Sequence, residues 1–317
     1  MSTTSLDSPT ADAASRGGDA PPAAAVDARP AAAAGPRPFR VIRPNSGWSA
    51  LNVAEIWRFR DLFLTMAARD MRVRYRQTFL GAIWVVLQPM MAAGVFTFLF
   101  GVLARMPRPD ERIPFFLFSF VGLTGWGVFS GTLGRASGSL VGNAHLISKV
   151  AFPRMVLPLA TVAGTLVDLL VSLAVIAGML AFYGINPGPG ALMLPVWVLI
   201  LTVAGMGLGL LAAALTVTWR DVGYVQPAVT QFLMYASPVV YTAAAVEQSG
   251  AQAAARAAFH LNPMVPALEG LRCAVLGPTA GSVSAGGVAY AAVSGVAVFA
   301  LGAAVFARAE RRFADVI

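Results

Sequence analysis

The chain has 317 residues, of which 57% are hydrophobic and only 12% are charged, and its mean hydropathy is +0.69. A soluble globular domain carries roughly 25% charged residues, so this composition excludes a water-soluble fold and indicates a membrane protein. The formal net charge of +8 at pH 7 does not indicate a partner nucleic acid, because the arginines lie at the ends of apolar runs and not on a separate basic domain.

The first part of the chain is predicted to lie outside the bilayer. Residues 1–46 are rich in alanine and proline and lack apolar periodicity, which predicts a disordered cytoplasmic tail. In residues 47–79 bulky apolar side chains alternate with basic ones, which predicts an amphipathic interface helix on the membrane surface. We expect Arg72, Arg74 and Arg76 to bind a lipid phosphate or pyrophosphate through bidentate hydrogen bonds. The alternative is a simple positively charged anchor.

Residues 80–317 contain apolar runs that are long enough to cross a bilayer, since a membrane-spanning helix needs about 20 mostly apolar residues. The predicted spans are residues 80–103, 114–133, 156–182, 194–217, 224–244 and 287–307. Lysine and arginine are concentrated on one side of this topology, and such an excess marks the cytoplasmic side, which places both termini in the cytoplasm. The predicted fold class is therefore an all-α, polytopic integral membrane protein with six transmembrane helices.

Two shorter semi-apolar pieces, residues 251–261 and 263–276, lie on the predicted outer side before the last span. Each is too short to cross the bilayer. The dipeptide Asn262-Pro263 between them indicates a turn followed by a helix start. This pattern predicts a re-entrant helical hairpin on the periplasmic face, although two helices lying on the surface would give the same sequence.

Charged and small residues inside the predicted spans are few. Asp168 lies well inside an apolar run, where an ionisable group indicates a functional site by default. Because no second charge is expected at that depth, we favour a structural hydrogen bond over a proton relay. Gly205 and Gly209 form a GxxxG pair, which is typical of closely packed membrane helices.

The sequence contains no catalytic pattern. Its two histidines, His145 and His260, fall on opposite sides of the membrane, and its single cysteine, Cys273, can form neither an internal disulfide nor a metal cluster. The only lysine, Lys149, is not preceded by the glycine-rich loop that holds phosphates in a P-loop. We therefore predict no catalytic residue, no metal site and no cofactor in this chain, and any ATP that drives it must bind a separate subunit.

Short motifs follow one another in a recognisable order over residues 50–317. The first motif is the basic segment of residues 57–76. Further along, a short helix is predicted to lie on the membrane surface and to end at Pro153; it is either a docking element for a partner or an ordinary connection. The further motifs are Gln77-Thr78-Phe79-Leu80-Gly81, Leu87-Gln88-Pro89, Phe152-Pro153-Arg154, Arg220-Asp221-Val222, Ser237-Pro238-Val239, Asn262-Pro263 and Leu268-Glu269-Gly270-Leu271-Arg272. In this order they resemble the type 2 ABC permeases that export polysaccharides such as O-antigen, capsule and teichoic acid.

The resemblance implies a homodimer of six-span subunits with two copies of a separate ABC subunit that binds ATP and Mg. It implies that the substrate is a lipid-linked polysaccharide, above all O-antigen, which crosses the bacterial inner membrane from cytoplasm to periplasm. It also implies that residues 143–154 form a coupling segment against the ATPase. The expected ATPase contacts are Asn143, His145, Lys149, Phe152, Arg154, Arg220 and Asp221.

A glycan path needs aromatic rings, because their apolar faces stack on sugars. The candidates for lining a channel between the two subunits are Trp84, Phe96, Phe98, Tyr224, Phe232, Tyr235 and Tyr241. Aromatic residues in membrane helices also face lipid. Two alternatives stay open: a type 2 ABC permease for a small lipid or drug, with a less aromatic path, and a membrane-embedded enzyme that acts on lipid-linked sugars.

Overall fold

The computed structural model describes residues 57–76, 81–106, 108, 110–147, 149, 152–248, 250 and 252–310. The predicted tail and both ends of the 47–79 segment lie outside these residues. Within the described part every regular element is helical and no strand occurs, which confirms the all-α fold.

The helices are, in chain order, α2 (Arg60–Arg76), α3 (Gly81–Phe96), which continues as a π-helical segment (Thr97–Leu103), α4 (Phe115–Gly138), α5 (Ala144–Ile147), α6 (Val156–Ala160), α7 (Val162–Tyr183), α8 (Leu194–Thr218), α9 (Val222–Tyr235), α10 (Ala243–Gln248), α11 (Ala253–His260), α12 (Met264–Leu276) and α13 (Ala285–Glu310). Among the described residues, five stretches are long and apolar enough to cross a membrane: Ile83–Leu103, Phe115–Gly138, Val156–Tyr183, Gly188–Thr218 and Ala285–Glu310. They correspond to five of the six predicted spans, and the chain is a polytopic membrane protein.

The helix predicted over residues 224–244 is shorter than expected. α9 has 14 residues, about 21 Å at 1.5 Å per residue, against a hydrocarbon core of about 30 Å. Residues 236–241 form turns and bends, because Pro238 lacks an amide hydrogen and disfavours helical backbone at Ser237. The prediction of one continuous helix over this range is therefore wrong, and a sixth span stays a prediction.

α4 and α8 form the centre of the helix bundle. In their most apolar windows 78% and 61% of the residues are buried within the chain, compared with 6% for the span that contains α3. Glycines let the two central helices approach each other. A Cβ atom at Gly205 would lie 2.6 Å from the carbonyl oxygen of Phe129, and one at Gly209 would lie 2.6 Å from the Cβ of Ala136. The GxxxG pair thus packs helices closely, as predicted.

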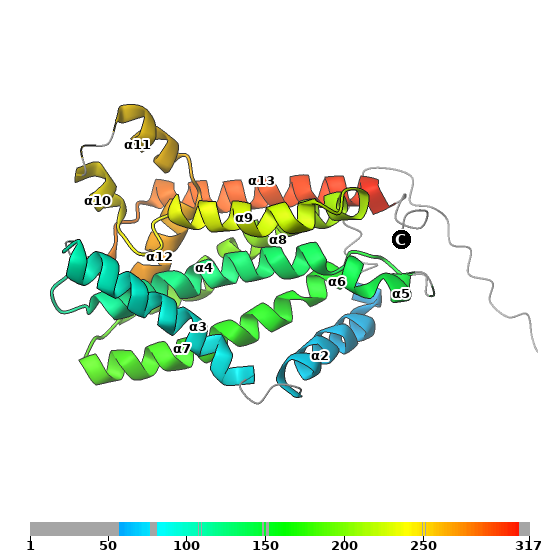
Figure 1. The fold of residues 1–317 in the computed structure, drawn as a ribbon, viewed down its shortest axis with the longest axis horizontal. Helices are drawn as coiled ribbons and strands as arrows, with labels where there is room; N and C mark the ends of the chain where they lie inside the picture. The colour runs from blue at the N-terminus through cyan, green and yellow to red at the C-terminus, as the bar shows by residue number, and fades with distance from the viewer. Residues whose placement is uncertain are drawn as a thin grey trace, which may run out of the picture. The chain divides into compact units, whose positions relative to one another are not determined.

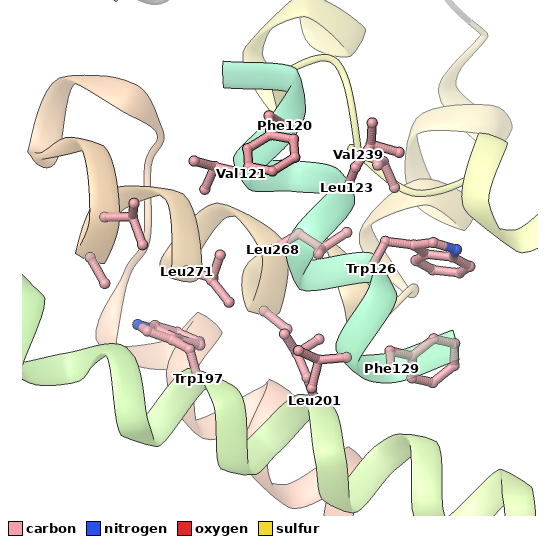
Figure 2. Close-up of a cluster of buried hydrophobic side chains, with 14 of the residues drawn as sticks. Phe120, Val121, Leu123, Trp126, Phe129, Trp197, Leu201, Val239, Leu268 and Leu271 are labelled. Carbon is pink, nitrogen blue, oxygen red and sulfur yellow. The ribbon is translucent and has the colours of Figure 1, made fainter. Parts of the chain in front are cut away.

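Buried apolar side chains fill the space between α4, α8 and α12 (Figure 2). Leu268 and Leu271 of α12 pack on Gly125 of α4, where an added Cβ would lie 3.1 and 3.4 Å from them. Trp197 of α8 packs on Gly270, where an added Cβ would come within 2.1 Å of the indole ring. Lipid tails are as apolar as these side chains, so the cluster stabilises the bundle mainly through close van der Waals contact.

Both pieces of the predicted hairpin are helical. α11 is exposed apart from Phe259, whereas α12 is buried against α4, α8 and α13. Asn262 starts α12, because its Oδ1 accepts a hydrogen bond from the Met264 amide at 3.0 Å, while its Nδ2 donates to the Ser237 hydroxyl at 2.9 Å. The burial of α12 favours a hairpin over two surface helices. α10 and α11 lie at one end of the long helices and α2 and α5 at the other (Figure 1).

Candidate functional site

A cavity of about 560 Å³ lies among α3, α4, α7 and α9. This volume falls within the roughly 300–1,000 Å³ of small-ligand pockets. Its wall combines four aromatic rings with amide, hydroxyl and carboxylate groups. The aromatic residues are Trp84, Phe96, Trp126 and Tyr235, and the polar ones are Gln88, Thr124, Ser130, Thr165, Asp168, Ser172 and Gln231.

Several polar groups of the cavity wall act as hydrogen-bond acceptors. The Thr124 and Ser130 hydroxyls donate to the carbonyl oxygens of Phe120 and Trp126, both at 2.8 Å, and keep lone pairs that can accept. The Asp168 carboxylate accepts only. The wall therefore offers acceptors to the hydroxyl groups of a ligand, while the Gln88 and Gln231 amides can both donate and accept.

An ion pair is built into this wall. Arg135, in the last turn of α4, donates from Nη2 to Oδ2 of Asp168 and from Nη1 to the Thr165 hydroxyl at 3.3 Å. Gly164 gives the guanidinium room, since a Cβ there would lie 2.7 Å from Nη1. The expectation that Asp168 has no second charge nearby is wrong, because Arg135 reaches it from the neighbouring helix. The pair agrees with a structural role for Asp168.

The structure brings Trp84, Phe96 and Tyr235 together in the cavity, with Trp126 as a further ring that the sequence did not single out. Three other predicted aromatics, Phe98, Tyr224 and Phe232, are exposed on the surface of the chain. The last predicted aromatic, Tyr241, packs on Phe259, and its hydroxyl donates to the Tyr235 carbonyl at 2.9 Å. The channel-lining role of all seven residues stays a prediction.

The predicted ATPase-contact residues lie mainly between α4 and α6. His145 and Lys149 are exposed, whereas Phe152 packs partly buried against a second apolar cluster, which is built around Leu140, Ile147 and Phe306. Asn143 and Arg154 are tied to other helices. The Asn143 Oδ1 accepts a hydrogen bond from Arg69 of α2 at 2.6 Å, and Nη1 of Arg154 donates to the carbonyl of Glu310 at 2.8 Å.

The second predicted contact point is the connection between α8 and α9. Arg220 and Asp221 are both exposed there, next to Trp219, which is also exposed. The Asp221 carbonyl accepts from the amides of Tyr224 and Val225 at 3.0 Å and so begins α9. Both side chains are accessible to a partner, and the contact itself stays a prediction.

α2 is amphipathic, as the sequence predicts. Leu62, Phe63 and Met66 pack against the second apolar cluster, while Trp57 is 68% exposed with the Arg60 guanidinium 5.9 Å from its ring centre. Arg72, Arg74 and Arg76 lie in its last two turns. Arg72 is exposed; the side chains of the other two lie outside the described part. Their binding to a lipid phosphate stays a prediction.

Arg272 of α12 is fully buried. Its Nη1 donates to the Tyr241 carbonyl at 3.0 Å, its Nη2 donates to the Pro238 carbonyl, and its guanidinium lies 4.2 Å from the ring centre of Phe118. The neighbouring Glu269 accepts from the Ala243 amide at 2.6 Å. These hydrogen bonds hold the turns after α9 against the hairpin. They could not be predicted from helical periodicity.

Comparison with known proteins places this architecture in a family. The pattern of the ABC-2 type transporters matches residues 61–276, which run from α2 to the end of α12. The chain is 32% identical over 213 residues to the O-antigen export system permease protein RfbA of Myxococcus xanthus, covering 67% of this chain and 79% of that protein. It is 26% identical over 182 residues to an O-antigen export system permease protein RfbA of Klebsiella pneumoniae, covering 57% of this chain and 69% of the relative. The chain belongs to the ABC-2 type transporter family.

Proposed function

We propose that this chain is the permease subunit of an ATP-driven exporter that moves lipid-linked O-antigen from the cytoplasm to the periplasm. The observation that carries the proposal is the 32% identity with an O-antigen export permease over two thirds of the chain. The apolar helices and the cavity among α3, α4, α7 and α9 support it, because a carrier needs a path within its membrane bundle.

The energy source is a separate ATPase, present in two copies, which binds ATP and Mg. The 317-residue sequence contains no P-loop motif, and its only lysine, Lys149, lies in an exposed loop. Membership of the ABC-2 type transporter family supports such a partner. We assign the contact to the coupling segment, residues 143–154, with Arg220 and Asp221 as a second contact.

The protein lies in the bacterial inner membrane with both termini in the cytoplasm. Basic residues support this orientation. Arg69 lies in α2, and Lys149 and Arg220 lie in loops on the side with the excess of lysine and arginine, which is the cytoplasmic side by the positive-inside rule. α2 lies at that same end of the bundle, opposite α10 and α11 (Figure 1).

Two copies of the chain enclose the export channel. Tyr224 and Phe232 of α9 are 82% and 74% exposed, and Tyr235 at the end of the same helix is exposed as well. Trp84 of α3 and Phe98 of the π-helical segment that follows it are exposed too. These rings would meet the glycan in the dimer, which is what aromatic stacking on sugars requires.

The cavity of each protomer supplies polar contacts along this path. Sugar hydroxyl groups are hydrogen-bond donors, and the Thr124, Ser130 and Asp168 oxygens can accept from them. Trp84 in the same wall is half-exposed and offers a ring for stacking. This combination suits a saccharide better than a lipid tail, which offers no donors.

Copurification with the ATPase encoded beside this chain tests the proposal. We expect the tagged chain to bring down an active ATPase, and Lys149→Glu to weaken that complex by reversing an exposed charge in the coupling segment. Arg256→Glu is the matched control, because Arg256 is exposed on α11 at the opposite end of the bundle. Absence of any copurifying ATPase would remove the energy source and favour the membrane-enzyme alternative.

A further inference from the structure

The coupling segment is tied to α2 at its first residue. Nη2 of Arg69 donates to Oδ1 of Asn143 at 2.6 Å and to Oδ1 of Asp70 at 2.9 Å. The other end of the Asn143 amide group donates from Nδ2 to the Ser139 carbonyl at 2.8 Å. Asn143 therefore joins three elements: α2, the end of α4 and the coupling segment itself.

The last residue of the segment is tied to the end of α13. Oε1 of Glu310 accepts a hydrogen bond from the Arg154 amide at 2.9 Å, and the Arg154 guanidinium donates back to the Glu310 carbonyl at 2.8 Å. The second bond satisfies one of the carbonyl groups that a helix leaves unpaired at its C-terminus. The two residues thus exchange hydrogen bonds in both directions, across 156 positions of sequence.

Apolar packing joins the two ties. Ile147 lies between Asn143 and Arg154 in the sequence and is buried in one cluster with Met66 of α2 and Phe306 of α13. Phe152 packs against the same cluster. α5 has only four residues, and a helix of this length is not stable without tertiary contacts. The position of the segment is therefore set by α2 and α13, and not by its own helix.

We propose that Arg69 and Glu310 are positioning residues that make α2, the coupling segment and the end of α13 one moving unit. A displacement of the segment by the ATPase then shifts the interface helix and the last transmembrane helix together. This inference rests on the proposed function, because it takes the ATPase to act on residues 143–154. Neither residue has to touch the ATPase or the polysaccharide.

Matched substitutions test the two ties. Arg69→Ala removes the first tie, and Glu310→Ala removes the carboxylate bond of the second while leaving the bond to the Glu310 backbone carbonyl. Arg69→Lys keeps a cationic donor and Glu310→Gln keeps the acceptor oxygen. In cells that lack the chromosomal copy, we expect both alanine variants to lower surface O-antigen about tenfold at equal permease levels, since loss of one charge-assisted bond changes an equilibrium by about that factor. The Lys and Gln variants should export within about twofold of the wild type.

ATP hydrolysis separates transmission from docking. The purified Glu310→Ala complex should retain its ATPase subunit and hydrolyse ATP near the wild-type rate while export falls. Normal export by both alanine variants would overturn the inference, and so would loss of the ATPase subunit from Glu310→Ala, because the tie would then serve docking. If the wild-type chain itself binds no ATPase, the proposed function fails instead.

Hydrogen exchange on the wild-type complex tests the same inference without a variant that could misfold. We compare amide exchange without nucleotide and with ADP trapped by vanadate after hydrolysis. Peptides from α2 and from the end of α13 should change protection together with peptides from residues 141–147. A change confined to residues 141–147 would overturn the inference.

Discussion

Removing the carboxylate of Asp168 is the perturbation whose cost the structure defines best. In the native chain Arg135 donates to Asp168 from Nη2 and to Thr165 from Nη1. The side chains of Arg135 and Asp168 are 25% and 18% exposed. An exposed ion pair contributes about 0–1 kcal/mol, whereas removing one partner of a buried pair costs about 3–5 kcal/mol. For this mostly buried pair we expect Asp168→Ala to destabilise the chain by about 2–3 kcal/mol.

Thermal unfolding of the purified complex measures this cost. At about 2–4 °C per kcal/mol, the midpoint for Asp168→Ala should fall by about 5–10 °C. Glu111→Ala is the control, since Glu111 is exposed in the loop before α4, and its midpoint should not change. The double variant Arg135→Met/Asp168→Leu removes both charges and fills the space with apolar atoms, so it should recover at least half of the loss.

Two outcomes would contradict a stabilising role of the Arg135–Asp168 ion pair. If Asp168→Ala unfolds at the same temperature as Glu111→Ala, the ion pair does not stabilise the packing of α4 on α7. If the double variant is as unstable as Asp168→Ala, the loss does not come from an uncompensated Arg135 charge.

Two further predictions concern helix packing and the cavity. Gly302→Ala should destabilise the chain by about 1–3 kcal/mol, because the new Cβ would lie 2.0 Å from the Gly207 carbonyl oxygen and would push α13 away from α8. The control is Gly134→Ala, whose new Cβ would meet no atom within 4 Å, so its unfolding midpoint should stay unchanged or rise. Equal midpoints for the two variants would contradict the close α8–α13 contact. Trp84→Ala should reduce surface O-antigen roughly threefold to tenfold, because it removes about 0.5–1.5 kcal/mol of ring stacking in the cavity. Phe182→Ala, at the exposed end of α7, should not reduce it. Equal export by both would contradict a role for the cavity.

The membrane spans could be predicted because their length is a local property of the sequence. A helix that crosses about 30 Å of hydrocarbon needs a long apolar run, and five such runs fold as helices of that length. The Asn262-Pro263 turn was equally local. The exception is α9, where the Ser237-Pro238 step ends the helix although the following residues are apolar enough to continue it.

The contacts that build the candidate site could not be predicted, because they join residues far apart in the chain. Arg135 and Asp168 are 33 positions apart, and Arg69 and Asn143 are 74 apart. The burial of Arg272 likewise depends on carbonyl groups of the turns after α9. Trp126 could have been predicted as a residue of the cavity wall. Ser130 lies one turn further along the same face of α4, and this spacing places an aromatic ring and a hydroxyl group side by side.

Deletion of the gene in the bacterium that carries it tests most directly whether the chain exports O-antigen. If the chain is the export permease, O-antigen should disappear from the surface lipopolysaccharide, and the polymer should accumulate on its lipid carrier inside the cell. The wild-type gene should restore export, and Lys149→Glu should not. Unchanged surface O-antigen in the deletion strain would contradict the proposed export function.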